Sequence, residues 1–215
     1  MFNHTAFPIT TNSTVTTDPE VRALVDKSQP GIITFYPAES VIYAQGEAAG
    51  PLYLVEFGSV RICRLTADGR RQINSFHFAG EVFGFEAGAE HQSYAESIDG
   101  AGIRVLRAAD RSGFATQLLG IALKGLSRVQ EHLLLLGRMN ANEKMASFLL
   151  DLRERQDIDD MVVLPMQRND IADYLGLTFE TVSRVLRVLK DRKIIRLPSV
   201  DRIEILDAEA LASLT

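Results

Sequence analysis

The chain has 215 residues, a net charge of −5 and 46% hydrophobic residues, which is ordinary for a globular protein of one or two domains. It contains one cysteine, Cys63, which excludes an internal disulfide, a zinc site built from cysteines and a cluster held by several thiolates. The sequence has no secretory pattern at its N-terminus and no apolar run of about 18 residues. We therefore expect a cytoplasmic protein without a membrane span.

The first half of the sequence changes from a polar segment to a β-rich one. Residues 1–24 are polar and rich in threonine, which predicts a flexible N-terminal arm. Over residues 25–110, glycines recur between short apolar runs such as residues 52–55 and 103–106. The pair Asp68-Gly69 between two such runs predicts a tight hairpin. This pattern predicts a β-rich, sensor-like domain over 25–110, built as a sandwich, roll or barrel.

Residues 111–139 have a helical period, with apolar residues at alternating spacings of three and four. Such a heptad stripe predicts a long helix that pairs with a second copy, and a core helix packed against the β domain is the alternative. The adjacent Leu134 and Leu135 widen the apolar surface near the end of the helix. The predicted dimer interface consists of Leu119, Ala122, Leu126, Val129, Leu133 and Leu136.

The last domain, residues 140–215, contains a segment with the pattern of a helix-turn-helix. After a helix near residues 142–150, Ile171 and Leu175 lie one turn apart, and Ala172 leaves room for a crossing helix. Gly176 permits a left-handed turn, and Thr178 is a suitable N-cap for the next helix.

The helix after Thr178 has one apolar and one polar face. Its apolar positions follow the spacing i, i+3, i+4 and i+7 at Val182, Val185, Leu186 and Leu189. The opposite face carries Phe179, Glu180, Ser183, Arg184 and Arg187. Two strand-like runs, 194–197 and 202–206, predict the hairpin of a winged helix, followed by a short helix near Asp207.

Positive charge is concentrated beside this helix although the whole chain is acidic. Between Arg184 and Arg196 the one acid is Asp191. A local basic patch of this kind meets nucleic-acid phosphates. The basic residues are Arg184, Arg187, Lys190, Arg192, Lys193 and Arg196.

The order of β-rich domain, heptad helix and winged helix-turn-helix resembles the CRP/FNR superfamily of bacterial transcription regulators. The motif over residues 170–184 is most similar to the FNR and FixK branches, and residues 135–138 and 143–150 also look FixK-like. The resemblance implies an α+β fold with a cyclic-nucleotide-binding-type β-roll, a dimerisation helix and a winged helix-turn-helix. It further implies a homodimeric transcription activator whose partners are double-stranded DNA, a second copy and RNA polymerase.

The branch motif Glu-x-x-Ser-Arg carries over to Glu180, Ser183 and Arg184 as base-reading residues. A glutamate accepts from cytosine N4, and an arginine donates to guanine O6 and N7. The resemblance implies a palindrome like TTGAT-N4-ATCAA. The predicted phosphate contacts are Thr178, Thr181, Arg187 and Lys190.

Two residues that hold cyclic AMP in this superfamily are not kept, although Gly84 is. Phe85 stands in place of the ribose-binding glutamate, and Gln92 stands in place of the phosphate-binding arginine. The N-terminal cysteines of an FNR-type iron–sulfur cluster are also missing, so we predict no cofactor and no metal. One alternative is a ligand- or haem-sensing regulator of the same family, and His77 is the least implausible haem ligand. Cys63 is expected to be a packed, inert thiol, and the alternative is a redox switch, because its flanking arginines could lower its pKa.

Two further classes of function are alternatives to a DNA-binding regulator. An enzyme is disfavoured because the sequence has no phosphate-binding loop, zinc-protease or serine-hydrolase motif, and Asp159 and Asp160 lie in a loop. The other class is a β-roll binding module whose winged helix makes protein contacts without specific DNA readout.

Overall fold

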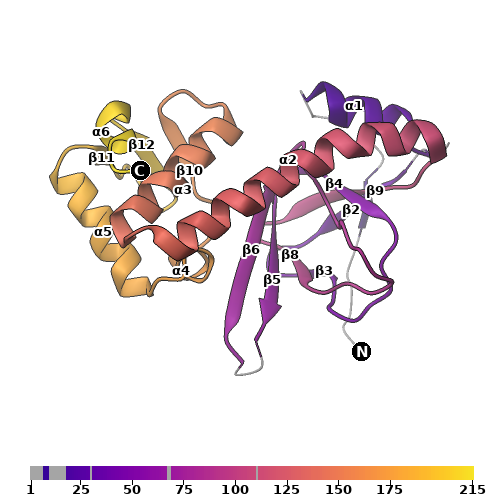
Figure 1. Cartoon of the computed structure of the whole chain (residues 1–215), viewed down its shortest axis with the longest axis horizontal. Helices are drawn as coiled ribbons and strands as arrows, with labels where there is room; N and C mark the ends of the chain where they lie inside the picture. The colour runs from indigo at the N-terminus through magenta and orange to yellow at the C-terminus, as the bar shows by residue number, and fades with distance from the viewer. Residues whose placement is uncertain (1–6, 10–17, 30, 67–68, 110) are drawn as a thin grey trace. The chain divides into compact units, whose positions relative to one another are not determined.

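The computed structural model describes residues 7–9, 18–29, 31–66, 69–109 and 111–215 (Figure 1). The chain divides into two compact units, residues 1–127 and 128–215, and the division falls within the long helix α2 (Arg111–Arg138). The first unit is mainly β and the second mainly α, in agreement with the predicted α+β fold. The predicted helix over 111–139 is confirmed to within one residue at its end.

The first unit contains two antiparallel sheets. A five-stranded sheet has the order β1-β2-β9-β4-β7, and a four-stranded sheet has the order β3-β8-β5-β6. The strands are β1 (Phe7–Ile9), β2 (Ile33–Tyr36), β3 (Val41–Tyr43), β4 (Leu52–Phe57), β5 (Ser59–Leu65), β6 (Arg71–Phe78), β7 (Val82–Phe83), β8 (Tyr94–Ser97) and β9 (Ala101–Leu106).

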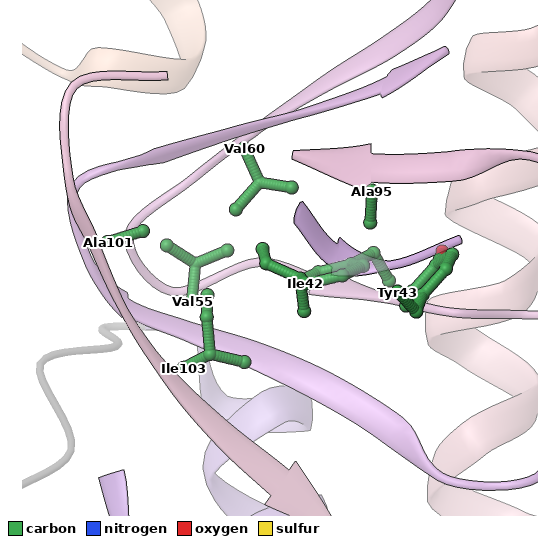
Figure 2. Close-up of a cluster of buried hydrophobic side chains, with 8 residues drawn as sticks. Ile42, Tyr43, Val55, Val60, Ala95, Ala101 and Ile103 are labelled. Atoms are coloured by element: carbon green, nitrogen blue, oxygen red, sulfur yellow. The ribbon is translucent and has the colours of Figure 1, made fainter. Parts of the chain in front are cut away.

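The two sheets share a core of apolar side chains. Val55 and Ile103 from the five-stranded sheet meet Ile42, Val60 and Ala95 from the four-stranded sheet (Figure 2). Because side chains alternate along a strand, the inward face of each sheet contributes every second residue to this layer. The layer fills the inside of the roll with aliphatic and aromatic groups.

The other face of the five-stranded sheet packs against helices. Leu24 of α1 (Pro19–Asp26) and Ile121 of α2 join Leu54 of β4 in a second buried cluster. Lys124 of α2 forms an ion pair with Glu20 of α1, with 2.8 Å between Nζ and Oε2. Strand β4 is therefore buried on both faces, which explains its nearly continuous apolar sequence.

The structure differs from the expectation of a flexible arm over residues 1–24 at two described places. Strand β1 pairs with β2, and α1 begins at Pro19. The helix starts here because the Asp18 carboxylate accepts from the backbone N–H of Glu20 at 2.8 Å, which satisfies an N-terminal donor. Residues 1–6 and 10–17 lie outside the described part of the chain, as does Asp68 of the predicted hairpin turn between β5 and β6.

The structure favours a packed, inert thiol at Cys63 over the alternative of a thiol with a lowered pKa. Its thiol is 2% exposed, and burial raises its pKa to about 12, with Glu96 adding to the rise. The neighbouring Arg61 is paired with Glu39 and Glu96, so its charge does little for the thiolate. A thiol that stays protonated and buried is a poor nucleophile, which argues against a redox switch at this position.

The second unit has four further helices around a small sheet of order β10-β12-β11. The hairpin of β11 and β12 confirms the predicted wing. The core consists of apolar residues from α3, α4 and α5 with the inner face of the sheet. The elements are α3 (Ala141–Gln156), β10 (Met161–Val163), α4 (Arg168–Leu175), α5 (Phe179–Asp191), β11 (Ile195–Arg196), β12 (Arg202–Ile205) and α6 (Ala208–Ala212).

The turn between α4 and α5 has the predicted left-handed residue. Gly176 has φ 61° and ψ 42°, and the N–H of Leu177 donates to the carbonyl of Ala172 at 2.9 Å. The ammonium of the buried Lys144 donates to the carbonyl of Leu175 at 3.1 Å. These contacts satisfy carbonyls at the end of α4 that have no partner within the helix. The hydrogen bond from Lys144 therefore links α3 to the turn that sets the direction of α5.

We predict that Gly176→Ala destabilises the protein by about 1 kcal/mol, because a β-carbon disfavours the left-handed conformation. A β-carbon here would meet Leu136 Cδ2 at 3.4 Å, an ordinary contact, so lack of space does not contribute. Denaturant unfolding measures the change. Gly176→Asn is the matched control and should cost less, because asparagine adopts this conformation more readily. Equal stability of the alanine variant and the wild type would contradict the prediction.

Candidate nucleic-acid interface

Helix α5 separates an apolar face from a polar one. Val182, Val185, Leu186 and Leu189 are all buried against the second unit. On the opposite side Glu180, Arg184 and Arg187 are exposed. Because the buried face fixes the rotation of the helix, these polar side chains are held toward solvent together.

Two of the three predicted base-reading residues are open to solvent, and the third has a protein partner. Glu180 and Arg184 are exposed, while Ser183 is half-buried. The Ser183 hydroxyl accepts a hydrogen bond from Nη1 of Arg168, with 3.4 Å between the atoms. The sequence pattern did not single out Arg168 as a site residue. The available signal was a basic residue at the first position of a helix, where the helix dipole disfavours positive charge.

The start of α5 is closed by its predicted cap. Thr178 Oγ1 accepts from the backbone N–H of Thr181 at 3.2 Å, and the two hydroxyls lie 3.2 Å apart. The Glu180 carboxylate accepts from its own backbone N–H and from the Thr178 side chain, and both bonds lower its pKa. Glu180 is therefore ionised at neutral pH and can only accept hydrogen bonds.

The basic residues predicted beside this helix are exposed along α5 and the segment after it. Arg187 and Lys190 lie one turn apart on α5. Arg196 on the wing forms an ion pair with Glu204 across the hairpin, so its charge is balanced locally. Arg184, Arg187 and Lys190 therefore supply the positive charge along α5 itself.

Helix α2 has one face against its own chain and one apolar face exposed. Ile121 and Leu135 are buried. By contrast, the stripe residues Leu119 and Leu133 are 62% and 63% exposed, and Leu126 and Val129 are each 53% exposed. Ala122 and Leu136, the remaining stripe positions, are half-buried, and Leu134 is 62% exposed. A row of exposed leucines is typical of a surface that pairs with another protein.

The part of the roll that matches the nucleotide site contains stacked rings and an acid. The His91 ring lies on the Tyr43 ring with centroids 3.6 Å apart, and Tyr53 stacks on Phe83 at 5.3 Å. The Glu86 carboxylate accepts from the backbone N–H of Gln92 at 3.0 Å. An amide that could meet a phosphate is thus occupied by a carboxylate.

The described histidines that could be considered as haem ligands lie against aromatic rings of the same chain. His77 lies 3.0 Å from the Ser75 hydroxyl and against the Phe83 ring. The His132 ring stacks on the Tyr174 ring with centroids 4.1 Å apart. Burial of His132 lowers its pKa, and the nearby positive charge of Lys144 lowers it further. His4 lies outside the described residues. Among the described residues no group of three or more histidine, cysteine or acidic side chains is placed to hold a metal ion. No described helix is long and apolar enough to cross a membrane.

Comparison with known proteins identifies both units. Residues 33–100 match the cyclic nucleotide-binding domain, and residues 143–214 match the Crp-like helix-turn-helix domain. The chain is 48% identical over 187 residues to the nitrogen fixation regulation protein FixK of Rhizobium meliloti, covering 87% of this chain and 89% of that protein. It is 34% identical to the transcriptional activatory protein AadR of Rhodopseudomonas palustris, covering 83% of this chain and 79% of that protein.

A solved structure has the same fold over most of this chain. The structure of FixK2 from Bradyrhizobium japonicum superposes with a TM-score of 0.81 at 36% identity, covering 86% of this chain and 98% of that one. The named relatives are regulators, and none of these names describes an enzyme. With a cyclic-nucleotide-binding-type β domain, a long helix and a helix-turn-helix in this order, the chain belongs to the CRP/FNR family of transcription regulators and is of the FixK type.

Proposed function

We propose that this regulator is a homodimer that binds a palindrome like TTGAT-N4-ATCAA, without cyclic AMP, an iron–sulfur cluster or an enzymatic activity. The observation that carries this proposal is the polar face of α5, where Glu180 and Arg184 are exposed one helical turn apart while the opposite face is buried. Two such helices, related by a two-fold axis, enter successive major grooves about 34 Å apart.

The chemistry of this face fits the proposed half-site. The ionised Glu180 accepts from the N4 amine of cytosine, and the Arg184 guanidinium donates to O6 and N7 of guanine. Thr178, Thr181, Arg187 and Lys190 contact the flanking phosphates in this proposal, which fixes the register of the helix on the duplex. The net charge of −5 is no obstacle, because the basic residues adjoin the reading face.

Pairing through α2 explains why its second face is apolar. Leu119, Leu126 and Leu133 recur at intervals of seven residues and are all more than half exposed in the single chain. Burying each leucine against a second copy contributes about 1.5–3 kcal/mol. A two-fold dimer of this kind also matches the symmetry of a palindromic site.

The proposal of effector-free binding depends on the β-roll interior. A cyclic phosphate placed beside Gln92 would meet the Glu86 carboxylate in place of a guanidinium, and like charges repel. The stacked rings of Tyr43 and His91 fill space close by. Cyclic AMP therefore lacks a compensating partner for its charge.

We further propose that the protein acts in the cytoplasm as an activator that contacts RNA polymerase. The name of the relative AadR, a transcriptional activatory protein, supports this direction of regulation. A β-roll module without specific DNA readout is the competing function, and the first experiment below distinguishes the two.

We predict that Glu180→Ala and Arg184→Ala each relax the base preference at one position of the half-site and weaken cognate binding by about tenfold or more. Fluorescence anisotropy on cognate and scrambled duplexes measures both effects. Glu154→Ala, an exposed acid on α3, is the matched control and should leave binding unchanged. A wild-type protein that binds both duplexes equally would favour the β-roll module instead.

We predict that Leu126→Asp combined with Leu133→Asp converts the dimer to a monomer, because the interface would have to bury unpaired charges. Light scattering measures the mass. Val200→Asp introduces a charge at an apolar side chain that is 84% exposed on the wing, and this control should remain dimeric. A dimer mass for the double variant would remove the stripe from the interface.

We predict that cyclic AMP neither binds with micromolar affinity nor changes DNA binding, and that the purified protein binds DNA in air and is colourless. Isothermal titration, anisotropy and an absorption spectrum measure these properties. Micromolar binding of the nucleotide, a Soret band or a DNA affinity lost in oxygen would each overturn the effector-free proposal.

A further inference from the structure

The contact between Arg168 and Ser183 joins the two helices of the helix-turn-helix at the reading face. Arg168 is the first residue of α4, and Ser183 lies in the second turn of α5. The guanidinium Nη1 lies 3.4 Å from the Ser183 hydroxyl oxygen, and both residues are half-buried. This bond reaches from one helix to a side chain that faces the groove in the proposed complex.

Helix stability does not explain an arginine at this position. The N-terminus of a helix carries a partial positive charge, so a cation there is unfavourable and an acid is preferred. The same turn uses Asp170 as its capping acid, which accepts from the N–H of Gln167 at 3.3 Å. Arg168 thus opposes the local electrostatics of α4, and its described hydrogen bond to a side chain goes to α5.

The chemistry of the pair fixes the direction of the hydrogen bond. A guanidinium has donors and no acceptor, so the Ser183 oxygen must accept. The hydroxyl proton then points away from Arg168. Within the described residues Ser183 has no recorded bond to a helix carbonyl, the usual acceptor for a serine in a helix. The proton remains available for an outside acceptor.

We propose that Arg168 is a specificity-determining positioning residue that holds Ser183 as a hydrogen-bond donor toward the DNA. The base edge opposite Ser183 then needs a major-groove acceptor, which guanine, adenine and thymine present and cytosine N4 does not. Glu180, one turn earlier, accepts only, so the two side chains demand opposite hydrogen-bonding groups. This inference rests on the proposed entry of α5 into the major groove.

The test replaces Arg168 and measures base preference rather than affinity alone. Each base pair of the half-site is changed to the other three, and binding to wild type, Arg168→Gln and Arg168→Lys is measured by anisotropy. Wild type should disfavour cytosine at one base pair by about three- to tenfold, the range of one hydrogen bond. Arg168→Gln, whose amide both donates and accepts, should reduce that preference to about twofold or less. Arg168→Lys, which only donates, should retain it.

A double-variant experiment assigns the effect to the serine. Ser183→Ala should abolish the preference at the same base pair, and adding Arg168→Gln to it should change that preference no further. Thermal unfolding of each variant checks that the helices remain folded, and a loss of stability alone does not alter the ranking of the bases. Unchanged ranking in Arg168→Gln or in Ser183→Ala would overturn the inference.

Failure of this inference differs from failure of the proposed function. If Arg168 acted only through a phosphate, Arg168→Gln would weaken all duplexes equally and reduce the salt dependence by about one unit. That result would refute the positioning role and leave specific DNA binding intact. A wild type that binds the palindrome no better than scrambled DNA would refute both.

Discussion

The left-handed turn at Gly176 is the constraint on which the orientation of the polar face of α5 depends. Helix α4 has eight residues, too few to be stable alone, so it persists because α5 and α3 pack against it. Gly176 allows the chain to change direction at once, so that α4 and α5 pack against each other. The Lys144 ammonium on the Leu175 carbonyl then fixes the end of α4 from α3. The direction of every polar side chain on α5 follows from this packing.

The second unit could be predicted closely because its local and tertiary requirements agree. Glycine, N-cap and apolar spacing each point to the same two helices, and all four predicted apolar positions of α5 are buried. The first unit was harder, because β3 has three residues and β7 has two, which is too short for a periodic pattern. Helix α1 was not predicted, because the sequence around its Asp18 cap is polar.

Two sets of side-chain contacts could not be inferred from neighbouring residues in the sequence. The arginines beside Cys63 suggested a lowered pKa, but Arg61 is paired with two carboxylates from distant strands, and burial dominates. Conversely, Arg168 and Ser183 are 15 residues apart and meet because two helices cross. For α2 the period revealed an apolar stripe, whereas the face toward the chain itself is set by packing against Leu54 and Leu24.

In the proposed complex with DNA, the polar face of α5 achieves selectivity partly by excluding unsuitable bases. An ionised Glu180 approaching DNA is repelled by the phosphates, so its presence is favourable only where a base donates to it. The basic residues that follow on the same helix offset this repulsion without depending on sequence. In the proposed complex, affinity and discrimination therefore reside in different side chains of one helix, and Ser183, held as a donor beside the acceptor Glu180, extends the discrimination to two base pairs. The rigid packing beneath α5 makes this possible, because a helix free to rotate would let either side chain avoid a mismatched base.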